Sequence, residues 1–183
     1  AASDVYKRQG VIEEVKQLET GNRLHYLAHH GVETPSKATT KLRVVFDASA
    51  TESPGKPSLN DCLHRGQVYL ENIVQLLMKF RLHKIAIVAD IEKAFLQVGL
   101  QDHERDVTRF LWVKDVTKPP SGENLVVYRF TRVAFGVKSS PFLLGIVVLH
   151  HLRKSDAEVA RKIEDNIYVD NVITGVETLE EAK

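Results

Sequence analysis

The sequence predicts an α+β fold, with strands that pair out of sequence order and helices on one face of the resulting sheet. Two observations support this prediction. Short segments rich in β-branched residues alternate with segments whose apolar residues recur at helical spacing, and turn-forming residues separate them. The chain has 183 residues, of which 43% are hydrophobic and 27% are charged, and this suits one globular domain or two closely packed subdomains.

The N-terminal half predicts a strand, a helix and a second strand. TKLRVVFDAS (40–49) has the β-branched and apolar content of a strand that ends in a turn. KIAIVAD (84–90) is a short strand whose Ile and Val content indicates burial. Between them, QVYLENIVQLLMKFRLH (67–83) carries apolar residues at helical spacing, namely Ile73, Leu76, Leu77 and Phe80.

The middle of the chain predicts a hairpin followed by a buried helix. RFLWV (109–113) and LVVYRFTRV (125–133) are expected to form an antiparallel pair around the turn-rich KPPSGEN. The near-continuous apolar content of FLLGIVVLHHLRK predicts a mostly buried helix. Its start is marked by an N-cap and a helix-opening proline, from Ser139, Ser140 and Pro141.

A second hairpin is expected in DNIYVDNVIT (165–174), after a short helix around DAEVARKI. Isoleucine and valine flank a polar pair, so a tight turn is expected at Asp170 and Asn171. Asp and Asn tolerate the left-handed conformation that such turns need. A plain structural turn therefore accounts for this stretch when it is considered by itself.

The two ends of the chain differ from the rest. AASDVYKRQ (1–9) resembles a translated sequencing adaptor, so we expect a non-native segment there and a native chain that starts near Gly10. Thr178 and Glu181 match a capping box, which predicts a helix that the chain does not complete. The chain is therefore expected to be a fragment of a longer protein.

The composition excludes several classes of protein. The apolar run PFLLGIVVLHHL is interrupted by Gly145 and is far shorter than the ~20 residues of a membrane-spanning helix, so no membrane partner is expected. A single cysteine, Cys62, excludes an intramolecular disulfide framework and a cysteine-based zinc site. The formal net charge of +1 neither requires nor forbids nucleic acid.

Asp90 and Asp170 each stand where a predicted apolar strand ends. A carboxylate in such a place is costly unless it is hydrated, hydrogen-bonded or bound to a metal ion. If neighbouring strands bring the two acids together, a divalent cation would offset their repulsion, and Mg²⁺ suits oxygen ligands completed by water and phosphate. Two unrelated surface acids are the alternative that spacing alone leaves open.

Five sequence blocks, taken in order, resemble the reverse transcriptase of BEL/Pao-type long-terminal-repeat retrotransposons. They are LRVVFDAS, SLNDCL, VADIEKAFLQVGL, VAFGVKSSPFL and YVDN. The resemblance implies the fingers and palm of a right-hand polymerase, the palm having a ferredoxin-like antiparallel sheet with helices on one face. It assigns residues 10–83 to the fingers portion, with room for the start of the palm, and residues 84–183 to a palm truncated at its C-terminal end.

The resemblance also implies a catalytic cluster. Asp90 and Asp170 would hold two Mg²⁺ ions, with Mn²⁺ as a substitute, and Ile91 would lend a backbone carbonyl. Asn171 would be the outer member of the cluster, where most reverse transcriptases have a second Asp, and its neutral side chain is expected to weaken metal affinity. Tyr168 would contact the primer end, although packing on a neighbouring residue is the default expectation for a strand tyrosine.

Further residues would bind the incoming nucleotide. Lys41 and Arg43 would match the cations that grip the triphosphate, and the alternative for both is a solvated strand face. Phe95 would collide with a 2′-hydroxyl and so favour deoxynucleotides, and its alternative is core packing. Phe135 and Gly136 begin FGVKSSP, the loop and helix start that would position nucleotide and template.

The function that this resemblance implies is RNA- and DNA-templated synthesis of DNA by a fragment of a retroelement polyprotein. Its partners would be a template with primer, deoxynucleoside triphosphates, and the protease, RNase H and integrase of the same polyprotein. Its location would be the cytoplasm, in virus-like particles. Two alternatives stay open: a catalytically decayed, nucleic-acid-binding remnant of the same element, and an unrelated metal-dependent phosphohydrolase.

Overall fold

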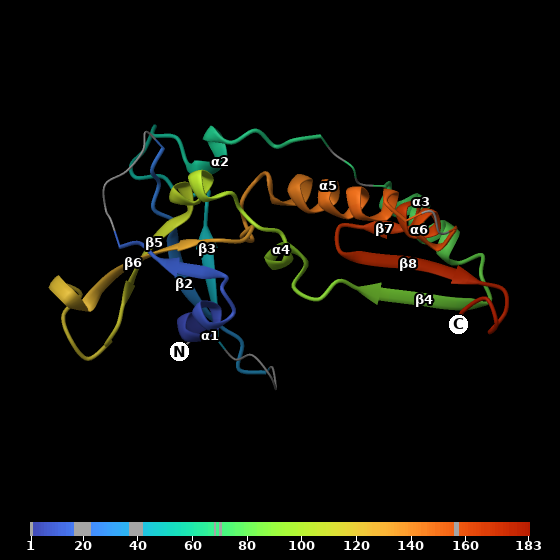
Figure 1. The fold of residues 1–183 in the computed structure, drawn as a ribbon, viewed down its shortest axis with the longest axis horizontal. Coiled ribbons are helices and arrows are strands. Elements are labelled where there is room, and N and C mark those ends of the chain that lie inside the picture. The colour runs from blue at the N-terminus through green and yellow to red at the C-terminus, as the bar shows by residue number, and fades with distance from the viewer. Residues whose placement is uncertain (1, 17–22, 37–41, 68, 70, 156–157) are drawn as a thin grey trace. The chain divides into compact units, whose positions relative to one another are not determined.

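The computed structural model describes residues 2–16, 23–36, 42–67, 69, 71–155 and 158–183. They form two compact units, each built from two segments of the chain (Figure 1). Unit 1 consists of Ala1–His64 and Gly99–Ser140, and unit 2 consists of Arg65–Val98 and Pro141–Lys183. The chain passes from one unit to the other more than once, and the assignment of residues 10–83 to the fingers, with room for the start of the palm, and of 84–183 to the palm stays a prediction.

Unit 1 contains two antiparallel sheets. β1 (Ile12–Glu14), β6 (Leu125–Phe130) and β5 (Arg109–Val113) form a sheet in the order β1-β6-β5. β2 (Ala28–Glu33) pairs with β3 (Leu42–Asp47) in a separate sheet. The β5–β6 hairpin and the β3 strand confirm the predictions for these segments. The short helices of this unit are α1 (Ala2–Arg8), α2 (Leu59–Cys62), η1 (Asp102–Thr108) and η2 (Gly122–Asn124).

Aromatic side chains join the two sheets of unit 1. The ring of Phe46 on β3 lies 4.8 Å, centroid to centroid, from those of Phe110 and Phe130 on the other sheet. His29 on β2 stacks on Trp112 of β5 at 5.3 Å. Because Phe110 and Phe130 are almost completely buried, this cluster forms the centre of the unit 1 core.

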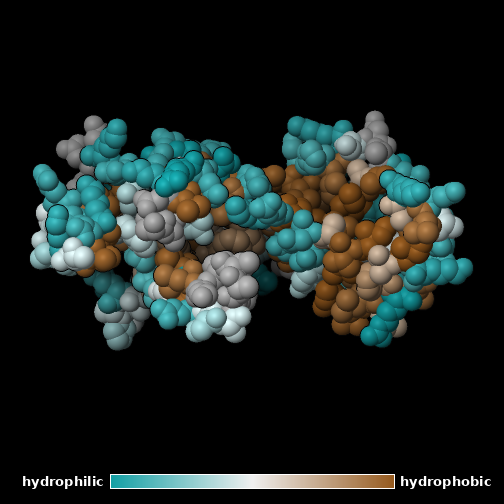
Figure 2. Space-filling view, turned by 90° about the horizontal axis from the view of Figure 1, so that it is seen from below, coloured by the Kyte–Doolittle hydropathy of each residue, from teal (hydrophilic) through white to brown (hydrophobic). Residues whose placement is uncertain are grey.

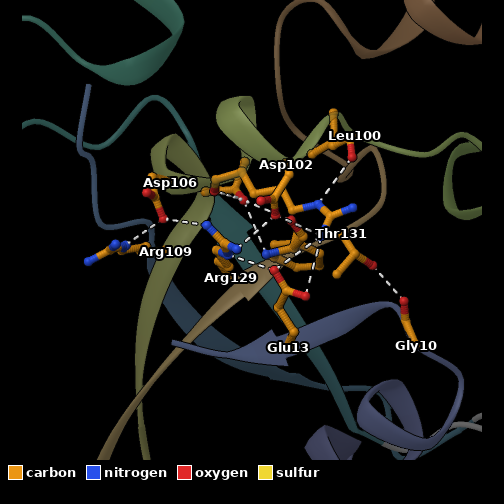
Figure 3. A network of polar contacts seen from close by, with 11 residues as sticks. Gly10, Glu13, Leu100, Asp102, Asp106, Arg109, Arg129 and Thr131 are labelled. Atoms are coloured by element: carbon orange, nitrogen blue, oxygen red, sulfur yellow. Dashed lines mark hydrogen bonds and ion pairs between the residues drawn. The ribbon is translucent and has the colours of Figure 1, made fainter. Parts of the chain in front are cut away.

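A network of charged side chains holds β1, β6 and η1 together (Figure 3). Arg129 lies at its centre, with Nε 2.7 Å from Glu13, Nη2 2.9 Å from Asp102 and Nη1 3.0 Å from Asp106. Burial by itself would raise the pKa of Asp106, but hydrogen bonds from Arg109 and Arg129 outweigh it, so the pKa of this carboxyl lies below its usual value. In the folded state, the Asp106 carboxylate and the guanidinium groups of Arg109 and Arg129 are therefore all charged.

Unit 2 contains one antiparallel sheet, in the order β4-β8-β7. Figure 1 shows α3, α5 and α6 gathered along one side of this sheet. None of the helices in the described ranges is long and apolar enough to cross a membrane. The strands are β4 (Ile85–Asp90), β7 (Ile167–Tyr168) and β8 (Asn171–Val176), and the helices are α3 (Ile73–Phe80), α4 (Ala94–Gln97), α5 (Ser140–Arg153) and α6 (Glu158–Glu164).

The helices α5 and α6 lie where the sequence predicted them, but α5 is not mostly buried, since Ile146 and Val147 are exposed. The helix α4 was not predicted, and two further differences concern α3 and the C-terminal segment. α3 is shorter than the predicted helix, because the Asn72 side chain accepts hydrogen bonds from the backbone of Val74 and Gln75 and starts the helix at residue 73. The predicted helix from Thr178 is wrong, since the chain forms turns there. The expected capping contact is nevertheless present, because Glu181 N donates to Thr178 Oγ1 at 3.3 Å.

The β7–β8 hairpin turns one residue earlier than predicted. Tyr168 pairs with Asn171, so Val169 and Asp170 occupy the turn and Asn171 begins β8. Val169 has a φ of 60°, whereas Asp170 does not have a positive φ, and this is the pattern of a type II′ turn, which favours glycine at its first central position. A β-branched residue in this conformation is strained. Because a β-branched residue is unfavourable at this position of a turn, local propensity predicted a turn at Asp170 and Asn171, and not at Val169 and Asp170.

His29 makes the stability of unit 1 sensitive to acid. Burial lowers the pKa of the His29 imidazole, so below the unfolded value of about 6.5 the unfolded chain binds more protons than the folded chain. The free energy of unfolding is expected to fall as the pH decreases from 7.5 to 5.5. Urea denaturation at both pH values should show a smaller fall for His29→Phe, which keeps the ring stacking and removes the titration.

His30→Phe is the matched control for this experiment, because His30 lies next in the same strand and is exposed. It should leave the fall unchanged. Burial lowers the pKa of His25 as well, so His29→Phe is expected to remove only part of the acid sensitivity. Equal losses of stability in the parent and His29→Phe would contradict the prediction.

Val169→Gly is expected to stabilise unit 2 by about 1 kcal/mol. The strain of a non-glycine residue with this φ is of order 1–3 kcal/mol, which exceeds the ~0.4–1 kcal/mol that glycine costs through the entropy of the unfolded chain. Denaturant titration of the purified chain measures the difference. Val172→Gly, in the adjoining strand where φ is not positive, should destabilise the unit. A loss of stability in both variants would show that Val169 is not strained.

Candidate active site

The pairing of β4 with β8 brings the predicted metal-binding residues to one end of the unit 2 sheet. Asp90, the last residue of β4, pairs with Asn171, the first residue of β8. The backbone N–H of Ile91 donates to the carbonyl of Asp170 at 2.9 Å, which extends the ladder into the turn. The register therefore sets Asp90 and Ile91 beside Asn171 and Asp170, although the two pairs are far apart in the sequence.

The side chains of this cluster differ in exposure and charge. Asp90 is exposed and Asp170 is half-buried. Asn171 Nδ2 donates to Asp170 Oδ1 at 2.9 Å, so the amide occupies one oxygen of the carboxylate. Asn171 Oδ1 is a neutral acceptor where an aspartate would carry a charge. The cluster thus combines two carboxylates with one amide.

This set of donors fits a hard divalent cation. It offers oxygen ligands from Asp90 and Asp170, from the Asn171 amide and from the Ile91 backbone. Mg²⁺ commonly binds through one or two protein carboxylates, with water and substrate phosphate completing its shell. Within the described ranges, no group of three or more His, Cys, Asp or Glu side chains is placed to hold a metal ion. The cluster has two such side chains, Asp90 and Asp170, because its third side chain is the amide of Asn171.

Tyr168 and Phe95 lie on the same unit as the carboxylates. Tyr168 pairs with Asn171, so the alternation of strand side chains places Tyr168, Asn171 and Asp90 on one face of the sheet. Phe95 is half-buried on α4, a four-residue helix that follows β4 and begins after Lys93, whose φ is 52°. The roles predicted for Tyr168 and Phe95 remain predictions.

The other predicted nucleotide-binding residues belong to unit 1. Arg43 is an exposed residue of β3 that pairs with Val32, and strand alternation places it on the opposite face from the half-buried Phe46 ring. Phe135 is 57% exposed. Lys41 lies outside the described residues. The predicted site residues are therefore distributed over both units, with the carboxylates in unit 2.

Asn60 holds the loop that contains Gly136, a role that the sequence analysis did not anticipate. Asn60 Nδ2 donates to the Gly136 carbonyl at 3.0 Å, and Asn60 Oδ1 accepts from the Lys138 N–H at 2.7 Å. Gly136 has a φ of 83°, and a Cβ at this position would lie 3.0 Å from the carbonyl oxygen of Phe46. Only glycine suits this combination of φ and space.

The segment SLNDCL contains a helix-capping motif that could have indicated the role of Asn60. Ser58 and Asp61 form a capping box at the start of α2, and the hydrogen bonds from Ser58 lower the pKa of the Asp61 carboxyl. Asn60 stands between the two capping residues. Its side chain is therefore held at a defined place on α2 and can bind a distant loop.

The chain matches the family model described as "Reverse transcriptase (RNA-dependent DNA polymerase)" over residues 22–183. No curated protein sequence matches it.

Solved structures of the foamy virus protease-reverse transcriptase have a similar fold. The complex with an RNA/DNA hybrid is 19% identical, with a TM-score of 0.64, over 98% of this chain and 19% of that chain. A complex with double-stranded DNA is 20% identical, with a TM-score of 0.64, over 99% of this chain and 31% of that chain. The native prototype foamy virus enzyme is 17% identical, with a TM-score of 0.66, over 98% and 19% of the two chains.

This chain thus spans less than a third of the length of each of these structures. At such identities the similarity shows the fold. It agrees with the predicted class, since the mixture of helices and antiparallel sheets matches the fingers and palm of a reverse transcriptase. Because the family model covers most of the sequence and the fold agrees with it, the chain belongs to the reverse transcriptases, the family of RNA-directed DNA polymerases.

Proposed function

We propose that the chain is the fingers-and-palm portion of a polymerase that extends a primer with deoxynucleotides, using two divalent ions at Asp90 and Asp170. The observation that supports this most directly is the register of β4 and β8, with Asp90 opposite Asn171 and Ile91 bonded to Asp170. Reverse transcriptases use divalent metal ions. Unit 2 would then belong to the palm, and unit 1, which carries Arg43, to the fingers.

Each residue of the cluster would have a defined task. Asp90 and Asp170 would bind two Mg²⁺ ions, or Mn²⁺ in their place, with the Ile91 carbonyl as a further ligand. When bound, such ions activate an attacking 3′-hydroxyl and stabilise the leaving pyrophosphate. Asn171 would orient the Asp170 carboxylate through its amide while adding no charge. Tyr168, on the same face of the sheet, would contact the end of the primer.

Further residues would bind the incoming nucleotide. Arg43 and Lys41 would neutralise the triphosphate, and such charges matter most where negative charge develops during phosphoryl transfer. Phe135 and Gly136 would lie against nucleotide and template, with Asn60 holding their loop. Phe95 would contact the sugar of the nucleotide.

The proposed partners are an RNA or DNA template with its primer, and deoxynucleoside triphosphates. Foamy virus relatives have been solved with double-stranded DNA and with an RNA/DNA hybrid, which supports this choice. Contacts would be made largely to backbone phosphates and would carry no sequence preference. The five ordered blocks support a finer assignment to a BEL/Pao-type polyprotein with protease, RNase H and integrase, located in cytoplasmic virus-like particles.

Asn171 also supports a second candidate function. The neutral Asn171 side chain lowers the affinity of the cluster for cations. A remnant that binds nucleic acid without catalysis would keep its function despite this lower affinity. The two candidates differ in the metal affinity of the cluster and in primer extension.

Metal binding tests the proposed cluster. Asn171→Asp should tighten Mn²⁺ binding by about tenfold, because one added charge near a divalent ion in a solvent-exposed site contributes on the order of 1–2 kcal/mol. Asp170→Asn should abolish binding, since a carboxylate shared by two ions has no neutral substitute. Titration of the chain with Mn²⁺, followed by electron paramagnetic resonance, measures both effects.

Primer extension on a chain prolonged by its natural downstream segment separates the two candidate functions. The parent should extend a primer, Asn171→Asp should do so at lower Mg²⁺, and Asp170→Asn should not extend at all. If the parent and Asn171→Asp fold and bind primer-template but neither extends it, the remnant is the correct description. If Asp170→Asn extends as well as the parent, the hairpin is only a structural turn.

Phe95→Ala tests the selection of the sugar. If the ring collides with a 2′-hydroxyl, its removal should admit ribonucleotides while deoxynucleotide incorporation stays measurable. The ratio of kcat/KM for the two nucleotides, measured in the prolonged chain, is the quantity to compare. Leu96→Ala, the next residue of α4, is the control for loss of packing. An unchanged ratio in Phe95→Ala would assign Phe95 to core packing.

A further inference from the structure

We propose that Asn60 is a positioning residue, which ties the Gly136 loop (residues 135–139) to the end of β3 and so keeps the loop in the conformation that binds nucleotide and template. This inference rests on the proposed function, because that proposal assigns nucleotide contacts to Phe135 and Gly136. It adds a residue that acts on the nucleotide only through the loop.

Asn60 joins three segments of unit 1. It lies on α2, and its backbone N–H donates to the carbonyl of Ala48 at 2.9 Å. Its Nδ2 donates to Ser49 Oγ at 2.8 Å and to the Gly136 carbonyl at 3.0 Å, while its Oδ1 accepts from the Lys138 N–H at 2.7 Å. Ala48 and Ser49 directly follow β3. One residue therefore connects α2, the end of β3 and the Gly136 loop.

The contacts with the loop are specific for an amide side chain. Gly136 offers a carbonyl and Lys138 offers an N–H, and asparagine supplies the donor and the acceptor that match them. Both hydrogens of Nδ2 are used, since the other one bonds to Ser49. An aspartate has nearly the same shape but no donor, so one of its oxygens would face the Gly136 carbonyl.

The middle of the Gly136 loop has little apolar burial. Phe135 is 57% exposed, and Gly136 and Lys138 are exposed as well. In the view of Figure 2, unit 1 presents a mostly hydrophilic surface with smaller hydrophobic patches. Exposed loops open readily unless specific contacts order them. The hydrogen bonds from Asn60 are therefore the contacts that determine the conformation of this loop.

Other contacts hold the loop at one end and limit its path. Ser140 is 2% exposed, and its Oγ donates to the Ala134 carbonyl at 2.7 Å, which closes the loop. A Cβ on Gly136 would lie 3.0 Å from the Phe46 carbonyl oxygen, so the loop passes close to β3. Loss of the Asn60 side chain is therefore expected to release the middle of the loop while Ala134 and Ser140 stay in place.

A loop that is competent for binding for only part of the time lowers the apparent affinity for its ligand. The apparent dissociation constant rises by the inverse of the competent fraction, while the bound complex is unchanged. Each hydrogen bond changes such an equilibrium by roughly two- to tenfold. Loss of Asn60 is therefore expected to raise the KM for the nucleotide and to leave kcat nearly unchanged.

Hydrogen exchange of the 183-residue chain tests the contact itself and needs no polymerase activity. In Asn60→Ala the Lys138 N–H should exchange about tenfold faster, because it loses its acceptor. In Asn60→Asp the same N–H should stay protected, because a carboxylate oxygen still accepts its hydrogen bond. Equal exchange of the Lys138 N–H in the parent and in Asn60→Ala would overturn the proposal.

Primer extension by a chain prolonged by its natural downstream segment tests the effect on the reaction. Asn60→Ala should raise the KM for the nucleotide by about tenfold with kcat nearly unchanged. Ser49→Ala, which removes only the side-chain contact to the end of β3, should raise KM by about twofold. If the parent extends a primer and Asn60→Ala has the parental KM, the inference fails while the proposed function stands. A parent that does not extend overturns the proposed function and the inference with it.

Asn124→Ala is the matched control, because Asn124 also holds a loop of unit 1 through its side-chain amide. Its Nδ2 donates to the carbonyls of Asp115 at 3.0 Å and Pro119 at 2.8 Å, and its Oδ1 accepts from the Asp115 N–H at 2.9 Å. This loop lies between β5 and β6 and has no proposed part in nucleotide binding. The variant should lose stability in denaturant titration and keep the parental KM. A KM raised equally in Asn124→Ala and Asn60→Ala would assign the effect to stability and overturn the proposal.

Discussion

The antiparallel register of β4 and β8 is the constraint on which the arrangement of unit 2 depends. It sets Asp90 opposite Asn171, and a slip of one residue would turn every side chain of the strand to the other face. Gly175, opposite Ala86, helps to exclude other arrangements. A Cβ on Gly175 would lie 2.5 Å from His83 Cβ and 2.7 Å from the Ile85 carbonyl oxygen, so the backbones approach closely at this point.

Unit 1 is held by two different kinds of contact. The aromatic cluster around Phe46 and Phe110 supplies apolar burial between the sheets, and Arg129 links β6 to acids from β1 and η1. Partly buried ion pairs contribute little net stability, but they penalise arrangements in which a charge loses its partner. The aromatic cluster therefore stabilises this unit through apolar burial, while the ion pairs specify how the strands are arranged.

Local sequence patterns predicted most of the elements, because strands such as β5 and β6 and helices such as α3 express their pattern of apolar residues within a few residues of the chain. The type of the β7–β8 turn was not predictable, since Val169 occupies a position that propensity assigns to glycine. The pairing of Asp90 with Asn171 depends on contacts between distant segments, which no local pattern specifies. For the same reason the hydrogen bonds from Asn60 to the Gly136 loop were not foreseen, although the capping box beside Asn60 was visible in the sequence.

Residue 171, whose amide donates a hydrogen bond to Asp170, can change between Asn and Asp through a single mutation in the gene. Asn and Asp side chains have nearly the same shape, so the register of β4 and β8 accommodates either. In the genetic code every Asn codon becomes an Asp codon by a single A-to-G change at its first base. Copies of this gene that differ at that base would encode the same fold with different charge at the cluster. The ratio of the two codons among such copies would therefore record whether selection still maintains the acidic form.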